Sequence, residues 1–166
     1  MALARPQPPP VCRQAQPGAG IGVGLPAPAG TGARYARNRG VLGRSTRGAW
    51  AVRETAHPPT FYLPLADVQR ALLSPAAGGS FCEWKGPARY WDLVDGARCL
   101  PQVAWTYPQP LAGAEPLADC VAFYAHELDC TVGGQKVVAQ AGGFYGGWIT
   151  PDLAGPFKGA PGSGAW

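Results

Sequence analysis

The dipeptide Asp95-Gly96 constrains the fold of this chain more than any other short feature. It separates two runs, 90–94 and 98–105, that are rich in aromatic and apolar residues. A short Asp-Gly link between two such runs is a strong signal for a β-hairpin, because both residues tolerate the backbone angles of a tight turn. We therefore predict a pair of antiparallel strands here.

The rest of the ordered chain shows the same alternation of short apolar runs and turn residues. A second hairpin is predicted at Gly133-Gly134, between 130–132 and 136–138. Further strands are expected at 41–42, 49–52, 61–63 and 120–124. This pattern predicts a mainly β fold, a small antiparallel meander that is barrel-like or tent-like.

One short helix is expected in addition. Leu65, Val68 and Leu72 follow at i, i+3 and i+7, and Pro75 comes shortly after them. This spacing predicts a helix over 65–73. The Gly- and Ala-rich stretch 76–79 is expected to be a loop.

The two ends of the chain differ from its middle. Residues 1–38 are rich in Pro, Gly and Arg and cannot bury enough apolar surface to fold, so we expect a disordered tail. Its arginines and lack of acids are typical of a transit peptide to a chloroplast or other organelle, but it is poor in Ser and Thr. The alternative is an extension without an address on a cytoplasmic protein.

Residues 39–166 are expected to form a single β domain. Their last 25 residues hold too many Gly and Pro for regular strands. We expect an ordered coil there, pinned by large aromatic side chains, because each such ring can bury ~150–250 Å² of surface. These side chains are Phe144, Tyr145, Trp148, Phe157 and Trp166.

The charge distribution argues against nucleic acid as a partner. Eight of the 14 basic residues and none of the 10 acidic residues lie within residues 1–53, so residues 54–166 hold six basic and ten acidic residues and carry a net negative charge. A nucleic-acid groove needs Lys or Arg clustered along one face. Only Lys85, Arg89 and Arg98 lie near the aromatic residues. There is also no apolar run long enough for a membrane helix.

The cysteines do not indicate a metal site. The five of them, Cys12, Cys82, Cys99, Cys120 and Cys130, contain no pair with C-x-x-C spacing. We expect free thiols that are mostly buried as small apolar groups, and neither a metal nor a cofactor. The sequence leaves the oligomeric state open.

The stretch 81–91 combines a thiol, a carboxylate, an amine and several aromatic rings. In an extended strand Cys82 and Trp84 would share one face, and Glu83 and Lys85 the other. Gly86-Pro87 is expected to turn the chain, because Gly tolerates unusual φ angles and Pro fixes its own. The cluster therefore suggests one wall of a binding site.

Four blocks of the chain resemble the motifs of a known family. The first, Glu54–Val68, reads Glu-Thr-Ala-His-Pro-Pro followed by two aromatics and a proline, with Ala56 where the family has Ser. The later blocks are Cys82–Trp91, Ala104–Pro110 and Val121–Tyr124. The resemblance is to the family catalogued as domain of unknown function four-two-seven, also labelled nucleotidyltransferase-like.

The resemblance implies a small, mainly β fold without an established activity. The family opens with an aromatic, Pro-rich segment and a strand pair, of which Arg5–Pro9 is a remnant and Arg39–Trp50 a compressed version. The Gly-Gly-Phe-Tyr-Gly-Gly-Trp run at 142–148 resembles the version in photosynthetic organisms.

Three residues are candidates for catalysis. His57, before two prolines, could act as a general base or only hold the turn by a hydrogen bond. Cys82 could be a nucleophile if a neighbour lowered its pKa, but buried packing is the alternative. Lys85 could bind a phosphate or carboxylate, or be a solvated turn lysine or an ion-pair partner.

A second group of residues is expected to bind a ligand. Glu54 could orient His57 or pair with Lys85. The aromatic rings could line a ligand site if one face stays open, and otherwise they fill the core. These rings are Tyr62, Trp84, Tyr90, Trp91, Trp105, Tyr107 and Tyr124.

Three functions remain as hypotheses. The first is a domain that binds a small molecule in an aromatic-lined site, with His57, Lys85 and Glu54 as polar contacts. The second is an enzyme, a transferase or hydrolase, that uses His57, Cys82 and Lys85. The third is a protein-interaction module that presents the Gly-rich aromatic C-terminal segment.

Overall fold

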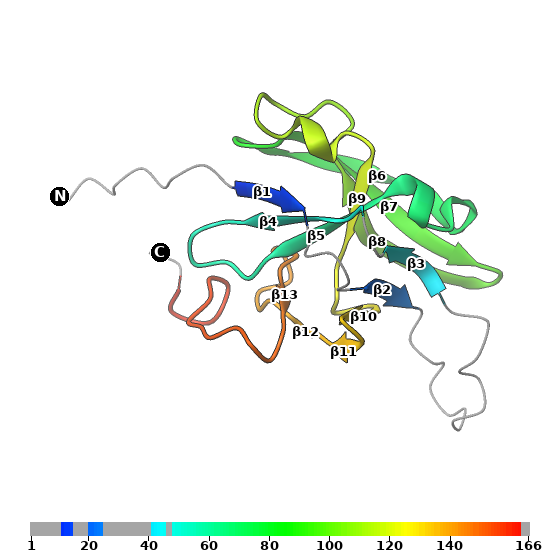
Figure 1. The fold of residues 1–166 in the computed structure, drawn as a ribbon. Helices are drawn as coiled ribbons and strands as arrows, with labels where there is room; N and C mark the ends of the chain where they lie inside the picture. Colours follow the sequence, from blue (N-terminus) through cyan, green and yellow to red (C-terminus); the bar gives the residue numbers. More distant parts are fainter. Residues whose placement is uncertain (1–10, 15–19, 25–40, 46–47, 164–166) are drawn as a thin grey trace, which may run out of the picture.

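A computed structural model describes residues 11–14, 20–24, 41–45 and 48–163 (Figure 1). Its largest element is a seven-stranded antiparallel sheet. In spatial order the strands are β1 (Val11–Gln14), β4 (Trp50–Arg53), β5 (Thr60–Pro64), β9 (Cys120–Phe123), β8 (Arg98–Thr106), β7 (Gly86–Asp95) and β6 (Leu73–Cys82). The prediction of a mainly β, antiparallel fold is confirmed.

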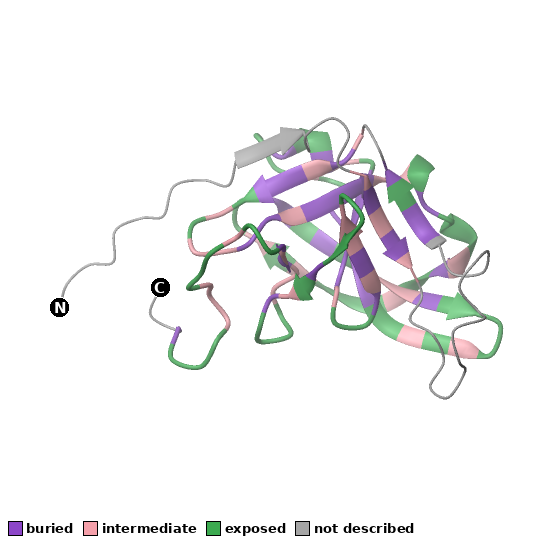
Figure 2. Ribbon diagram, turned by 60° about the horizontal axis from the view of Figure 1, so that its bottom comes forward, coloured by how far each residue is buried: buried purple, intermediate pink, exposed green. Residues whose placement is uncertain are grey.

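Two smaller sheets complete the fold. The first is four-stranded, in the order β11 (Gln135–Lys136), β10 (Asp129–Val132), β2 (Ile21–Gly24) and β3 (Val41–Ser45). The second pairs β12 (Val138–Ala139) with β13 (Trp148–Ile149). Figure 2 shows that buried residues concentrate on the strands, while many of the connecting loops are exposed.

The main core lies between the two larger sheets. Ile21 and Val23 of β2 and Leu42 of β3 pack in one cluster with Phe61 and Leu63 of β5. Apolar burial at about 25 cal/mol per Å² is the main driving force for such packing. Trp148 is completely buried in the same cluster, and its Nε1–H donates a hydrogen bond to Phe123 O at 2.9 Å. The C-terminal segment is therefore anchored to the domain.

The expectation of a helix over 65–73 is wrong. The described residues contain no α-helix, and this stretch forms two single 3₁₀ turns, η1 (Leu65–Asp67) and η2 (Arg70–Leu72). Val68 between them is extended, with φ −119° and ψ 141°, because it forms a bridge with Gly43. Pairing with a distant strand has outweighed the local helical spacing.

Two expected turns are placed differently. The predicted loop 76–79 lies inside β6, whose pairing with β7 only shifts register between Pro75 and Gly79. Pro75 is tolerated because β6 is an edge strand. The chain reverses at residues 83–85 rather than at Gly86-Pro87, since Cys82 pairs with Gly86. The Asp95-Gly96 hairpin is confirmed, with Asp95 opposite Arg98.

The N-terminal stretch contains strands that the sequence reading missed. Within 1–38, β1 pairs with β4, and β2 pairs with both β10 and β3. Ile21 and Val23 point into the main core, so the alternation Gly-Ile-Gly-Val-Gly is a two-residue strand period. Apart from residues 11–14 and 20–24, the predicted tail lies outside the described residues, as does Trp166.

Of the cysteine side chains that the structure describes, Cys120 and Cys130 are buried, Cys82 is half-buried and Cys99 is exposed, all as free thiols. Burial raises the pKa of Cys120 to about 11 and that of Cys130 to about 12, so both thiols are unreactive at neutral pH.

No helix in the described part is long and apolar enough to cross a membrane.

Candidate functional site

A row of aromatic residues crosses the face of the large sheet that points away from the main core. Register pairs Trp50 with Tyr62, Tyr62 with Ala122, Ala122 with Trp105, and Trp105 with Tyr90. Directly paired residues in a sheet project from the same face. Five strands therefore contribute one continuous line of side chains.

The rings of this face contact one another and form what we call the phenol cluster, made of Tyr62, Tyr90, Trp105, Tyr107 and Tyr124. Trp105 lies 4.4 Å from Tyr124 and 6.1 Å from Tyr62 between ring centroids, and its Nε1–H donates to the Tyr62 hydroxyl at 3.3 Å. Tyr107 lies 6.3 Å from Tyr62. At the rim, the half-buried Tyr90 shares a 2.8 Å hydrogen bond with Ser80.

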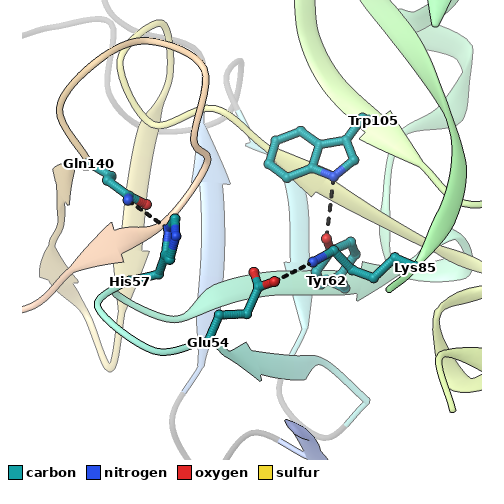
Figure 3. A network of polar contacts seen from close by, with 6 residues as sticks. All are labelled: Glu54, His57, Tyr62, Lys85, Trp105 and Gln140. Carbon is teal, nitrogen blue, oxygen red and sulfur yellow. Dashed lines mark hydrogen bonds and ion pairs between the residues drawn. The ribbon is translucent and has the colours of Figure 1, made fainter. Parts of the chain in front are cut away.

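An ion pair borders the phenol cluster. Lys85 Nζ lies 2.9 Å from Glu54 Oε1 (Figure 3). Lys85 is only 6% exposed, whereas the Glu54 side chain is 27% exposed. The ammonium has three N–H donors, and Glu54 is its one partner within the described ranges.

Local backbone geometry brings Lys85 to this position. It ends the turn between β6 and β7, and its carbonyl accepts a hydrogen bond from Leu111 N at 3.1 Å. The next residue, Gly86, has φ +98°, and a Cβ there would lie 3.1 Å from Gln109 O. Only glycine fits this backbone without strain. The loop after β8 therefore fixes the turn against the cluster.

The Tyr107 hydroxyl has no hydrogen-bond partner among the described residues, although Tyr107 as a whole is 6% exposed. In that same part of the chain, every side-chain N or O atom that is shut off from solvent has a hydrogen bond. The Tyr107 hydroxyl is therefore accessible to solvent.

Three phenols of the cluster, those of Tyr62, Tyr107 and Tyr124, are neutral hydrogen-bond donors. Burial is the first cause of the raised pKa values of Tyr62, Tyr107 and Tyr124. Charges on Glu54 and Cys82 would raise the pKa of Tyr62 and of Tyr107 further, which places both groups around these hydroxyls. The phenols stay protonated at physiological pH.

The C-terminal segment closes one side of the cluster. Gly146 packs so tightly on Trp105 that an added Cβ would overlap the indole ring. The Tyr124 hydroxyl donates to Phe144 O at 3.2 Å. Of the three aromatic residues in this run, Phe144 is exposed, Tyr145 is half-buried and Trp148 is buried, so they form no continuous exposed patch.

His57 is hydrogen-bonded to Gln140 (Figure 3). Gln140 Oε1 accepts from Gly147 N–H at 3.2 Å, which orients Gln140 Nε2 toward His57 Nδ1, at 2.9 Å, and toward Lys158 O. A backbone N–H can only donate, so Nδ1 accepts and the ring proton lies on Nε2. His57 thus holds the C-terminal segment in its neutral form.

The structure separates the predicted site residues into two groups. The first group lies in or beside the phenol cluster and consists of Glu54, Lys85, Cys82, Tyr62, Tyr90, Trp105, Tyr107 and Tyr124. Trp84 is exposed in the hairpin turn, and Trp91 packs on the main core, where its Nε1–H donates to Thr106 Oγ1. In the described part of the chain no hydrogen bond joins His57 to Cys82. The catalytic and binding roles stay predictions.

Two residues of the site were missed. Gln140 carries three hydrogen bonds between His57 and the C-terminal segment, and Gly146 allows that segment to touch Trp105. An isolated Gln among small residues gives no sequence signal. The glycine pairs at 142–143 and 146–147 did give a sequence signal, since repeated Gly indicates close backbone approach.

Within the described residues, no three His, Cys, Asp or Glu side chains converge as a metal site requires.

Removing single hydroxyls should distinguish free from bonded phenols. Tyr107→Phe is expected to change the free energy of unfolding by less than about 0.5 kcal/mol, because it breaks no hydrogen bond in the protein. Tyr62→Phe should cost about 1 kcal/mol, because Trp105 loses its acceptor. Urea unfolding measures both, and an equal cost for the two variants would contradict the assignment.

The role of His57 predicts a pH dependence. Burial lowers the pKa of His57 below its ordinary 6.5, so the unfolded chain binds a proton at higher pH than the folded one. Stability is therefore full above pH 6.5 and falls as the pH drops toward the lowered folded pKa. The urea midpoint should therefore fall between about pH 7.5 and pH 5.5. The fall should be smaller in His57→Asn than in the unsubstituted protein, because Asn does not titrate in this range. Equal drops would contradict this role, since both proteins keep His126.

Comparison with known proteins gives one match. Residues 36–134 match the model of a family described as a domain of unknown function (DUF427). No curated protein matched the chain. The matched range contains the ion pair and the whole phenol cluster, whereas Gln140 and Gly146 lie beyond it.

Proposed function

This chain belongs to the DUF427 family, and we propose that it binds a small molecule at the phenol cluster. The observation that carries the proposal is the Tyr107 hydroxyl, which solvent reaches and no described residue bonds, within an otherwise buried set of rings. A polar group that solvent reaches within a set of aromatic rings is a position where a bound molecule can replace water as the hydrogen-bond partner. A ligand would supply the missing partner.

The ion pair supports the same proposal. Burying a lysine with a carboxylate seldom stabilises a fold, because the loss of hydration offsets the attraction. Glu54, the partner of Lys85, nevertheless lies close enough to Tyr107 to raise the pKa of its hydroxyl, so the pair borders the phenol cluster. Aromatic walls with a few fixed polar groups are typical of small-molecule sites.

The other expectations remain open proposals. An enzyme using Cys82, His57 and Lys85 is less well supported than binding, because His57 is engaged with Gln140. The likeness of residues 142–148 to photosynthetic members of the family, and targeting of the N-terminal tail to an organelle, rest on the sequence alone.

The proposal is tested by thermal unfolding with planar bicyclic compounds of three charge classes: coumarin, coumarin-3-carboxylate and N-methylquinolinium. A ligand at about 100 times its Kd stabilises the folded state by about 2.7 kcal/mol, which raises Tm by several degrees. The double variant Tyr62→Phe with Tyr107→Phe keeps the rings and should lose most of the rise. If no compound of any class raised Tm at saturating solubility, the proposal would be refuted.

A further inference from the structure

The site has no net charge to offer a ligand. Lys85 is neutralised by Glu54 at 2.9 Å. Burial raises the pKa values of Tyr62, Tyr107 and Tyr124, so the phenols are neutral. A ligand with a net charge would bring an unpaired charge into this apolar setting, which costs several kcal/mol.

The site has more hydrogen-bond donors than acceptors. The Tyr107 O–H has no partner among the described residues, and the Tyr62 oxygen accepts from Trp105 while its own proton has no acceptor there. The Lys85 ammonium has three N–H groups and one described acceptor. The missing complement is an acceptor oxygen that carries no charge.

The rings determine the shape that fits. Trp105 contacts Tyr62 and Tyr124, and Gly146 packs closely against its indole ring. Aromatic faces favour planar partners through offset stacking. Tyr90 and Cys82 are half-buried at the edge of the cluster, which is the side from which such a partner would approach.

We propose that the phenol cluster takes an uncharged, planar ring compound that presents a carbonyl oxygen to the hydroxyls of Tyr107 and Tyr62. This ligand class rests on the proposed function, since it refines what the same site binds. A lactone, a lactam or a cyclic ketone fused to an aromatic ring has the required chemistry.

Calorimetric titration with three matched probes tests the ligand class. Coumarin carries a ring carbonyl and no charge, coumarin-3-carboxylate adds a charge to the same ring, and indole offers only a donor. Coumarin should bind at least about tenfold more tightly than the other two. Tyr107→Phe should weaken coumarin binding by about three- to tenfold, the value of one neutral hydrogen bond.

Tyr145→Phe is the matched control, because it removes a phenol hydroxyl outside the cluster and should leave coumarin affinity unchanged. If coumarin-3-carboxylate or indole bound more tightly than coumarin, and Tyr107→Phe weakened that binding, the ligand class would be overturned but the location of the site would stand. Coumarin binding that is insensitive to Tyr107→Phe would overturn the ligand class, because the carbonyl would then not be held by this hydroxyl. Absence of binding by all three probes would also overturn it, and the charge-class panel then decides separately whether the site binds any ligand.

Discussion

Gly146→Ala is expected to lower the free energy of unfolding by about 3 kcal/mol, the upper part of the range for overpacked sites. A methyl group at this position would overlap the Trp105 ring, whose Cζ3 and Cζ2 atoms would lie only 2.8 and 2.9 Å away. Neither group can move easily, because Trp105 is held by Tyr62 and the segment by Gln140 and Trp148. Urea unfolding measures the loss.

Gly143→Asn is the control for this substitution. An added Cβ at Gly143 meets nothing within 4 Å, and Asn tolerates its φ of +69°. Its cost should be below about 1 kcal/mol. In the double variant Gly146→Ala with Trp105→Leu, the smaller side chain should make room, so the two losses should not add. Equal costs for Gly146→Ala and Gly143→Asn would show that the segment does not press on Trp105.

Lys85→Met is expected to cost about 2 kcal/mol. Removing one partner of a fully buried ion pair costs about 3–5 kcal/mol, and the partial exposure of Glu54 reduces this figure. Met keeps the apolar stem of the lysine, so the loss reports the unpaired Glu54 carboxylate and not a cavity. The second substitution Glu54→Leu should restore much of the stability, because a paired apolar replacement leaves no buried charge.

A surface ion pair provides the control for Lys85→Met. Lys136 Nζ lies only 2.7 Å from Asp129 Oδ1, closer than the buried pair, but both side chains are exposed. Solvent and salt screen such a pair, so Lys136→Met should leave the urea midpoint unchanged. If Lys136→Met lowered the free energy of unfolding as much as Lys85→Met does, burial would not be the cause of the large effect at Lys85.

The hairpins could be predicted from the sequence because their signals are local. The Asp95-Gly96 and Gly133-Gly134 turns fix the register of the strands that flank them. The helix over 65–73 failed for the opposite reason, since the bridge from Val68 to Gly43 is set by a distant strand. β2 was missed because it lies in a Pro- and Gly-rich stretch, where it contributes just two core residues, Ile21 and Val23.

The candidate site was partly predictable for similar reasons. Residues within the family blocks, such as Tyr62, Trp105 and Lys85, could be singled out by type. The choice between a Glu54–Lys85 pair and a Glu54–His57 pair could not be made, because it depends on where the β6–β7 turn meets the end of β4. Tyr90 and Trp91 are neighbours in β7 and pack in different clusters on opposite faces of the sheet, as strand alternation requires.

The central claim is that the phenol cluster, and not the main core, is where this protein binds its ligand. Two indole N–H groups report on the two sides of the large sheet: Trp105 Nε1–H donates to Tyr62, and Trp148 Nε1–H donates to Phe123. In ¹⁵N–¹H spectra recorded during a coumarin titration, the Trp105 indole peak should move to saturation while the Trp148 peak stays in place. A Trp105 peak that does not move while the protein binds coumarin would contradict the account.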